Sequence, residues 1–351
     1  MKKIVSLLLV FVLVFGLTAC GGDSKKGDGT DKKAITMVGV DKTVEAKDFS
    51  TDVVPKKEYT IAVVVKSAAI PVWESHIIAA KKAGKDLGVK IIDYSPSKAD
   101  NVEEQKRILE DLITTGVDAV VLAPANTEAV KGPVQDLIDA GIPVIYDNTM
   151  GPSDVDYLTY VGVDNLKAGE MIANKMAALI GGKGKVVIME GVPGQSTSDI
   201  RTQGCIDTFK KSYPGIEFER AVTKWQFDEG RKVAEDYITK WGSSLSALIS
   251  VGGNQGEGAY EAIKAAGLDG KVLVNGFDVQ EPQFVAVSNG SEVFTVSQGV
   301  FYQAYLSVVA AVKALNGEEV PRTINCAITI VDKANLADMD ERPDAISKKT
   351  K

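Results

Sequence analysis

The chain has 351 residues, with a hydrophobic content of 45% and a charged content of 25%, which are typical of a globular protein. It is too long for one typical core, so we expect two lobes with additional segments at the ends. The formal net charge is −7 and Lys and Arg do not cluster away from the termini, which argues against nucleic acid as the main partner.

The N-terminus has the organisation of an export signal. Lys2 and Lys3 precede an apolar run over residues 4–17, which is short for a membrane span. The sequence LTAC that follows resembles the lipobox of bacterial lipoproteins, in which cleavage precedes the cysteine and the thiol receives a lipid. We therefore predict a lipoprotein signal peptide over residues 1–19 and an extracytoplasmic protein anchored to the bacterial cell membrane through Cys20. An ordinary signal peptide, or a membrane anchor with an incidental cysteine, is the alternative.

Residues 20–56 are predicted to be a flexible tether. The run GGDSKKGDGTDKK, residues 21–33, contains too little apolar surface to fold, and residues 34–56 show no clear pattern. Two further cysteines, Cys205 and Cys326, lie far apart in the sequence, and we expect free buried thiols in preference to a disulfide. Their spacing does not match a metal site.

From residue 59, short apolar runs alternate with amphipathic segments. Strands are predicted at 60–65, 90–94, 119–123, 144–147, 158–163, 185–189, 217–222, 247–251, 272–277 and 293–297, and helices at 102–115, 128–140, 168–180 and 228–241. Pro71 marks the first turn of another helix, and Asn101 and Asp228 are the expected N-caps. Apolar strands between helices predict an α/β fold, with ten strands divided between two parallel sheets covered on both faces.

Polar residues recur where these strands end. In open α/β sheets, ligands bind beyond the carboxyl ends of the strands. The residues at these places are Lys66, Asp147, Asn148, Asn254 and Asp278. Trp73 follows the first strand and offers an apolar face beside Lys66, so we predict that this segment is one wall of a ligand cleft.

The pattern as a whole resembles the sugar-type periplasmic binding proteins of class I, the ribose- and galactose-binding group that serves ABC importers. The resemblance covers residues 59 to about 330 and is carried by IAVVVKSAAIPVWES, GVDAVVLAPANTEAV, AGIPVIYDNTM, VGVDNLKAGEMIANKM and VNGFDVQEPQFVAVSNG followed by TVSQG. It implies two Rossmann-like lobes joined by three hinge crossovers, near Gly162-Val163, near Gln298 and near Asn325-Cys326. The N-terminal lobe would comprise residues 57–162 and 299–324, the C-terminal lobe residues 163–298 and 325–340, and residues 341–351 a polar tail.

The resemblance also implies a set of ligand-binding residues. They are Lys66, Trp73, Asp147, Asn148, Asp199, Trp225, Asn254, Asp278 and Gln298. Asp199 stands where sugar binders of this group carry an arginine, and Gly252-Gly253 replaces an Asn-Asp pair, which argues against ribose and galactose. Asp199 and Asp278 also suit the starts of helices, where a carboxylate caps free N–H groups.

The predicted site carries a net charge near −2, from Lys66 and three aspartates. Either Lys66 bridges two of them or the ligand brings a positive group, since buried charges need partners. We favour a neutral sugar or polyol held between the indoles of Trp73 and Trp225. The combination of Lys66, Asp147 and Asp199 is similar to binders of the furanosyl signal autoinducer-2, although Ile200 stands where those carry a glutamine.

Enzymatic function is not expected. The one histidine, His76, is predicted on the outer, solvated part of its helix, where it cannot form a nucleophile–base set. The glycine run GGNQGEG does not match a dinucleotide-binding motif. The prediction is a monomeric solute receptor, without cofactor or metal, that delivers its ligand to an ABC permease. The alternative is a sensory receptor that presents its closed form to a chemoreceptor or kinase.

Overall fold

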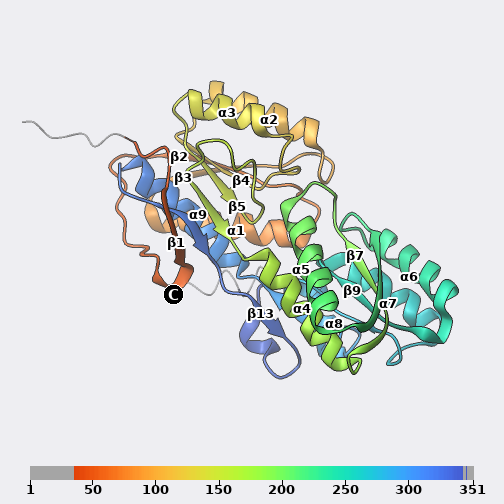
Figure 1. The fold of residues 1–351 in the computed structure, drawn as a ribbon. Helices are drawn as coiled ribbons and strands as arrows, with labels where there is room; N and C mark the ends of the chain where they lie inside the picture. Colours follow the sequence, from red (N-terminus) through yellow and green to blue (C-terminus); the bar gives the residue numbers. More distant parts are fainter. Residues whose placement is uncertain (1–34, 343–344, 346–351) are drawn as a thin grey trace, which may run out of the picture. The chain divides into compact units, whose positions relative to one another are not determined.

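The computed structural model describes residues 35–342 and Ala345, so Cys20 and the predicted signal peptide lie outside the described residues. Two parallel sheets organise this part of the chain (Figure 1). The larger sheet has the order β1 (Val40–Glu45), β12 (Pro321–Asn325), β6 (Thr159–Gly162), β5 (Val144–Asp147), β4 (Ala119–Leu122), β2 (Thr60–Val64) and β3 (Lys90–Tyr94). The smaller sheet has the order β10 (Leu273–Val274), β9 (Leu245–Ser250), β7 (Lys183–Glu190) and β8 (Gly215–Val222). The predicted α/β fold with parallel sheets is confirmed.

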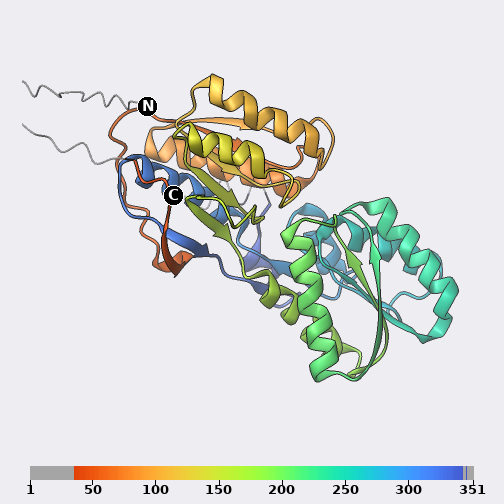
Figure 2. The same ribbon diagram turned by 45° about the horizontal axis from the view of Figure 1, so that its top comes forward.

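Helices cover both faces of the larger sheet. The helices of the described residues are α1 (Pro71–Leu87), α2 (Val102–Thr115), α3 (Lys131–Asp139), α4 (Asn165–Leu179), α5 (Ser196–Ser212), α6 (Phe227–Trp241), α7 (Gly253–Ala265), α8 (Glu281–Asn289) and α9 (Val300–Leu315), with short 3₁₀ turns at Ala46–Asp48, Gly242–Ser244 and Leu336–Met339. Side chains alternate along β2, so Ile61 and Val63 pack with α1 and α9, whereas Ala62 and Val64 pack with α2 and α3. In Figure 2, α2 and α3, amber and yellow, lie over one face of the sheet.

The smaller sheet is covered in the same way. Val186 and Ile188 of β7 pack with α4 and α5, and the intervening Val187 packs with α6 and α7. Within the described residues Cys205 and Cys326 are free buried thiols, as expected.

The residues at the starts of the helices were predicted correctly in part. Pro71 is the first residue of α1, and the Asn101 side chain accepts a hydrogen bond from the Glu104 N–H at the start of α2. Asp228 was predicted wrongly as an N-cap, because Gln226 precedes α6 and Asp228 lies inside the first turn. An acidic residue there still interacts favourably with the positive end of the helix.

The tether predicted over residues 20–56 was wrong for the part that the structure describes. Val40–Glu45 is an edge strand that pairs in parallel with β12. The Thr36 and Val40 N–H groups donate to Ala314 and Val320 carbonyls, and Phe49 packs against the core beneath α1 and α9. Most side chains of β1 are exposed, so the strand depends on backbone pairing and shows no apolar alternation.

The strand predicted at 293–297 was placed in the wrong kind of sheet. It appears as β11 (Thr295–Ser297), which pairs antiparallel with β13 (Thr329–Val331) in a separate two-stranded ribbon. The chain runs from the larger sheet to the smaller one after β6, returns through α9 after β11, and leaves again after β12. The Cys326 N–H donates to the Gly162 carbonyl, so two of these crossings are hydrogen-bonded to each other.

The polar tail was predicted to begin at residue 341, but residue 341 still belongs to the folded part of the chain. Glu341 is buried, and its Oε1 accepts hydrogen bonds from Ser297 Oγ at 2.7 Å and from the Gly299 N–H at 2.9 Å. The Gly299 N–H precedes the first turn of α9, whose free N–H groups attract a carboxylate. Glu341 therefore holds the chain where it passes from β11 into α9.

The close approach of α4 and α5 provides a test of the packing. A Cβ at Gly169 would lie 2.0 Å from the Arg201 carbonyl oxygen, whereas a Cβ at the exposed Gly132 of α3 would meet nothing within 4 Å. We expect Gly169→Ala to lower the free energy of unfolding by about 1–3 kcal/mol, because backbone must move. Gly132→Ala should leave the free energy of unfolding unchanged or raise it by up to about 1 kcal/mol. Urea unfolding measures both, and equal effects would contradict the packing described.

Candidate ligand-binding site

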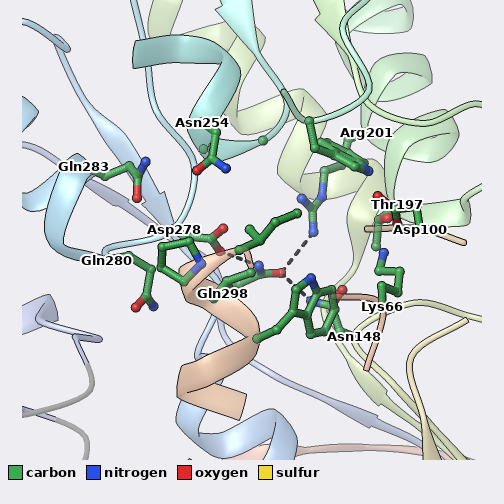
Figure 3. Close-up of a pocket in the computed structure, with 17 residues that line it drawn as sticks. Lys66, Asp100, Asn148, Thr197, Arg201, Asn254, Asp278, Gln280, Gln283 and Gln298 are labelled. Atoms are coloured by element: carbon green, nitrogen blue, oxygen red, sulfur yellow. Dashed lines mark hydrogen bonds between the residues drawn. The ribbon is translucent and has the colours of Figure 1, made fainter. Parts of the chain in front are cut away.

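A cavity lies at the carboxyl ends of the strands, lined by side chains from segments of both sheets (Figure 3). Of the predicted site residues, those that line it are Lys66, Trp73, Asn148, Trp225, Asn254, Asp278 and Gln298. Sequence analysis missed Asp100, Thr197, Arg201, Gln280 and Gln283 among the polar residues of the wall. Asp147 and Asp199 do not line it.

Lys66 is buried where β2 ends and is held by neutral partners. Its Nζ donates to Thr149 Oγ1 and to Gln195 Oε1, each at 2.9 Å. Burial lowers the pKa of Lys66 to about 8, against the opposing effect of the nearby Asp100 carboxylate. The ammonium also lies 5.1 Å from the centre of the Trp73 ring, at a distance suited to a cation–π contact.

Gln195, in the segment before α5, connects the two walls of the cavity. Its Oε1 accepts from Lys66 and from Trp225 Nε1 at 2.8 Å, and its Nε2 donates to Asp100 Oδ1 and to the Ala125 carbonyl. All four positions of the side-chain amide are therefore used. Sequence analysis missed this residue because it lies in a loop and carries no charge.

Arg201 is the main residue that sequence analysis missed. The side chain is 3% exposed, and it donates to Asn165 Oδ1 at 2.7 Å, to the Val251 carbonyl at 3.2 Å and to Gln298 Oε1 at 3.0 Å. Its guanidinium stacks 3.8 Å from the centre of the Phe277 ring. Burial lowers the pKa of Arg201 to about 10, which still leaves the group charged at neutral pH.

The prediction of Asp199 as a ligand residue is not supported by its place in the structure. Asp199 is exposed in the first turn of α5, where its Oδ2 accepts a hydrogen bond from the Gly194 N–H. The buried face of α5 is instead occupied by Ser198, Arg201 and Cys205. The arginine that we expected to be missing is therefore present two residues further along the chain.

Gln298, at the second crossing of the chain, joins the polar groups on the floor of the cavity. Its Oε1 accepts from Arg201 and from Asn148 Nδ2, and its Nε2 donates to Asp278 Oδ1 (Figure 3). Burial raises the pKa of Asp278, and Arg201 and this hydrogen bond oppose the shift. Asn148 also donates to Gln303, so α9 is joined to the same hydrogen-bond network on the floor of the cavity.

Asp147 lies behind the cavity wall. It is 1% exposed, its Oδ1 lies 3.4 Å from Ser307 Oγ, and its Oδ2 is 3.7 Å from His76 Nε2. The prediction that His76 is solvated was wrong, because its side chain is fully buried on the inner face of α1. Lys66, Asp147 and Asp199 consequently do not meet in the cavity.

Glycines make room for the second indole. A Cβ at Gly191 or at Gly252 would lie 1.9 Å and 2.3 Å from atoms of the Trp225 ring, one glycine after β7 and the other after β9. Trp225 itself has a φ of 62°, which turns the backbone at this point. Gly252, the first of two consecutive glycines after β9, thus admits a large apolar side chain.

The ionic groups that line the cavity balance. Lys66 and Arg201 supply two positive charges, and Asp100 and Asp278 two negative ones. The net charge near −2 predicted from the sequence was wrong, because it counted Asp147 and Asp199 and omitted Arg201 and Asp100. A neutral, hydroxyl-rich molecule with an apolar face suits this wall of donors, acceptors and indoles.

Within residues 35–342 and Ala345, no helix has the length and apolar character needed to cross a membrane. No group of three or more His, Cys, Asp or Glu side chains within the same residues is arranged to hold a metal ion.

Comparison with known proteins identifies the family. The periplasmic binding protein domain matches residues 61–319. The chain is 29% identical over 78% of its length to the ribose import binding protein of Bacillus subtilis, covering 88% of that protein, and 25% identical over 81% of its length to the D-xylose-binding periplasmic protein of Escherichia coli, covering 87%.

Solved structures give the same result. A carbohydrate transporter solute-binding protein of Agrobacterium radiobacter in complex with D-arabinose matches with a TM-score of 0.76 and 27% identity, over 81% of this chain and 97% of that one. An ABC transporter solute-binding protein of Actinobacillus succinogenes with bound D-allose matches with a TM-score of 0.75 and 27% identity, over 80% of this chain and 100% of that one. The chain therefore belongs to the periplasmic binding protein family, among the sugar-type solute-binding proteins of class I, which are receptors and not enzymes.

Proposed function

We propose that this protein captures a neutral sugar or polyol in the cavity between its two sheets and delivers it to an ABC permease while anchored to the membrane by a lipid on Cys20. The observation that carries the proposal is the charge balance of a wall that also contains two indoles. A neutral ligand leaves the balance between the charges of Lys66 and Arg201 and those of the carboxylates undisturbed. Its apolar C–H face suits the rings of Trp73 and Trp225.

Two polar groups of the wall remain available to a ligand. The Thr197 hydroxyl is buried and has no hydrogen-bond partner among the described residues. Asp278 uses Oδ1 for Gln298, and no hydrogen bond reaches Oδ2 within the part of the chain that the structure describes. A buried unpaired hydroxyl costs about 1–3 kcal/mol, so a ligand that completes these bonds is favoured.

The similar proteins support a sugar as the ligand class, but they bind different sugars and so do not indicate which one binds here. The names of the similar proteins include ribose and D-xylose, and the similar structures contain D-arabinose and D-allose. The autoinducer-like arrangement of Lys66, Asp147 and Asp199 is not assembled, so we do not favour the signalling alternative.

Closure around the ligand would depend on contacts between the two walls. The Thr127 N–H donates to the Gly194 carbonyl, and Ser196 Oγ donates to the Met150 carbonyl, both beside the Gln195 contacts. These bonds join residues 124–150, at the ends of β4 and β5, to the segment before α5. We propose that residues 57–162 and 299–324 form one lobe and residues 163–298 and 325–340 the other, and that these bonds form when the lobes close.

Lipid anchoring has its own test. Cells that express the full chain are grown with a clickable palmitate analogue, and we expect the label on the wild type and its loss in Cys20→Ser, which would be released from the membrane fraction. Labelled Cys20→Ser protein would show that the lipid is attached elsewhere and would overturn the assignment.

The ligand class is tested by calorimetry of the purified protein against pentoses, hexoses, inositols, linear polyols and amino sugars. We expect at least one neutral member to bind with a Kd of about 1 μM or below, which corresponds to about −8 kcal/mol. Heat from the amino sugars alone, or from no member of the panel, would contradict the proposal.

Asp278 and Asp199 form a matched pair of variants. Asp278→Asn removes a carboxylate from the wall, and a hydrogen bond to a charged acceptor contributes about 1.5–3 kcal/mol, so we expect Kd to rise about ten- to a hundredfold. Asp199→Asn removes the same charge from outside the cavity and should leave Kd unchanged. If the two variants weaken binding equally, the site has been placed wrongly.

Lys66 gives the site a pH dependence. With a pKa of about 8, lowered by burial, Lys66 is mostly charged at pH 7 and mostly neutral at pH 9. If the ammonium donates to a ligand oxygen, affinity falls as pH rises through about 8, by up to about tenfold between pH 7 and pH 9. Lys66→Gln should bind more weakly and lose this dependence. A Kd for the wild type that is constant from pH 7 to pH 9 would exclude the role.

A further inference from the structure

His76 is the single histidine of the chain, and it faces Asp147 immediately behind the cavity wall. The side chains are 0% and 1% exposed, with Nε2 and Oδ2 3.7 Å apart. Neither of these two atoms has a hydrogen-bond partner among the described residues. Two polar atoms with no other partner are thus buried against each other.

The geometry fixes the position of one ring proton. Nδ1 of His76 lies 2.9 Å from the Val72 carbonyl oxygen, one turn earlier in α1. A carbonyl oxygen only accepts hydrogen bonds, so Nδ1 carries a proton. In a neutral ring Nε2 would then be bare, and its lone pair would face a carboxylate oxygen. Two acceptors in a buried contact repel, so this arrangement requires a second proton.

Among the residues that the structure describes, no strong donor reaches Asp147 and would make a second proton unnecessary. Ser307 Oγ lies 3.4 Å from Asp147 Oδ1 but 2.8 Å from the Gln303 carbonyl, and its single proton goes to the nearer acceptor. Burial raises the pKa of the Asp147 carboxyl, and the neighbouring His76 ring, the long Ser307 contact and Lys66 oppose the shift.

The charged and titratable groups that surround the pair favour a positive ring. Asp147 and Asp278 both interact electrostatically with His76, and Lys66 also interacts with both carboxylates. Tyr160 and Cys326, the other groups near Asp147, have pKa values raised by burial and are neutral at pH 7. The indole of Trp73 lies 4.9 Å from the ring, where an aromatic face stabilises a cation.

We propose that His76 and Asp147 form a buried imidazolium–carboxylate pair at neutral pH, and that this pair positions Trp73 and Asn148 for the ligand. The His76 ring packs against Trp73 at a tilt of 39°, and Asp147 directly precedes Asn148, whose φ of 61° turns its side chain toward Gln298. The pair joins α1 to the end of β5, so it fixes the indole wall relative to the floor of the cavity. Its role in affinity rests on the proposed function, whereas its protonation does not.

The protonation state is measured on the ligand-free protein. Because the chain has one histidine, ¹⁵N-histidine labelling gives one pair of ring resonances without assignment variants. We expect both nitrogens to show the shifts of protonated nitrogens at pH 7. A bare Nε2 at that pH would overturn the proposal, whether or not any sugar binds.

Two variants then separate positioning from folding. In Asp147→Asn the amide donates to a bare Nε2, so the ring should become neutral while its place is kept. In Asp147→Leu the nitrogen has no partner. The Trp73 indole resonance, identified with Trp73→Phe, should stay in place in Asp147→Asn and move in Asp147→Leu.

The same variants report on binding, with the neutral ligand that gives the most heat in the calorimetric panel. Asp147→Asn should bind within about threefold of the wild type, and Asp147→Leu should bind at least about tenfold more weakly. Wild-type affinity together with an unmoved Trp73 resonance in Asp147→Leu would show that the pair does not position the wall.

Discussion

The pairing of buried charge is the constraint on which the rest of the site depends. Arg201 and Lys66 are 3% and 4% exposed, and an isolated charge at such a place would cost several kcal/mol. Each is held by a glutamine that also contacts a carboxylate, Gln298 for Arg201 and Gln195 for Lys66. These partners come from distant parts of the chain, so the site exists only when both sheets are formed.

The indoles add a second requirement, which is space. Trp225 fits only because glycines follow two neighbouring strands of the smaller sheet, and its ring nitrogen is fixed by Gln195. Trp73 is fixed differently, by the packing of its helix and by the ring of His76. A rigid apolar wall on each side lets hydroxyl groups be recognised by direction, since a ligand ring held in one plane presents its hydroxyls at fixed angles.

The sequence predicted most strands, most helices and the edge of the sheets where the site lies, because apolar periodicity and the carboxyl-end rule follow from backbone geometry. The strands β1, β12 and β13 were not predicted. Asp199 was predicted in the site and Arg201 was missed, because the side of the helix that faces the core cannot be read from so short a segment. The two residues differ by about 200° around the helix axis. It misplaced His76 because a single histidine gives no periodicity of its own. β1 was missed because an edge strand with exposed side chains has no apolar pattern to detect.

The central claim is that a neutral molecule lies between the two indoles with its hydroxyls on a charge-balanced wall. Native mass spectrometry of the protein, purified without denaturation, tests this most directly. The account predicts a bound mass equal to a sugar or polyol of zero charge, absent when both Trp73 and Trp225 are replaced by leucine in protein that remains folded by circular dichroism. A ligand with a net charge, or a neutral one retained by the double variant, would contradict it.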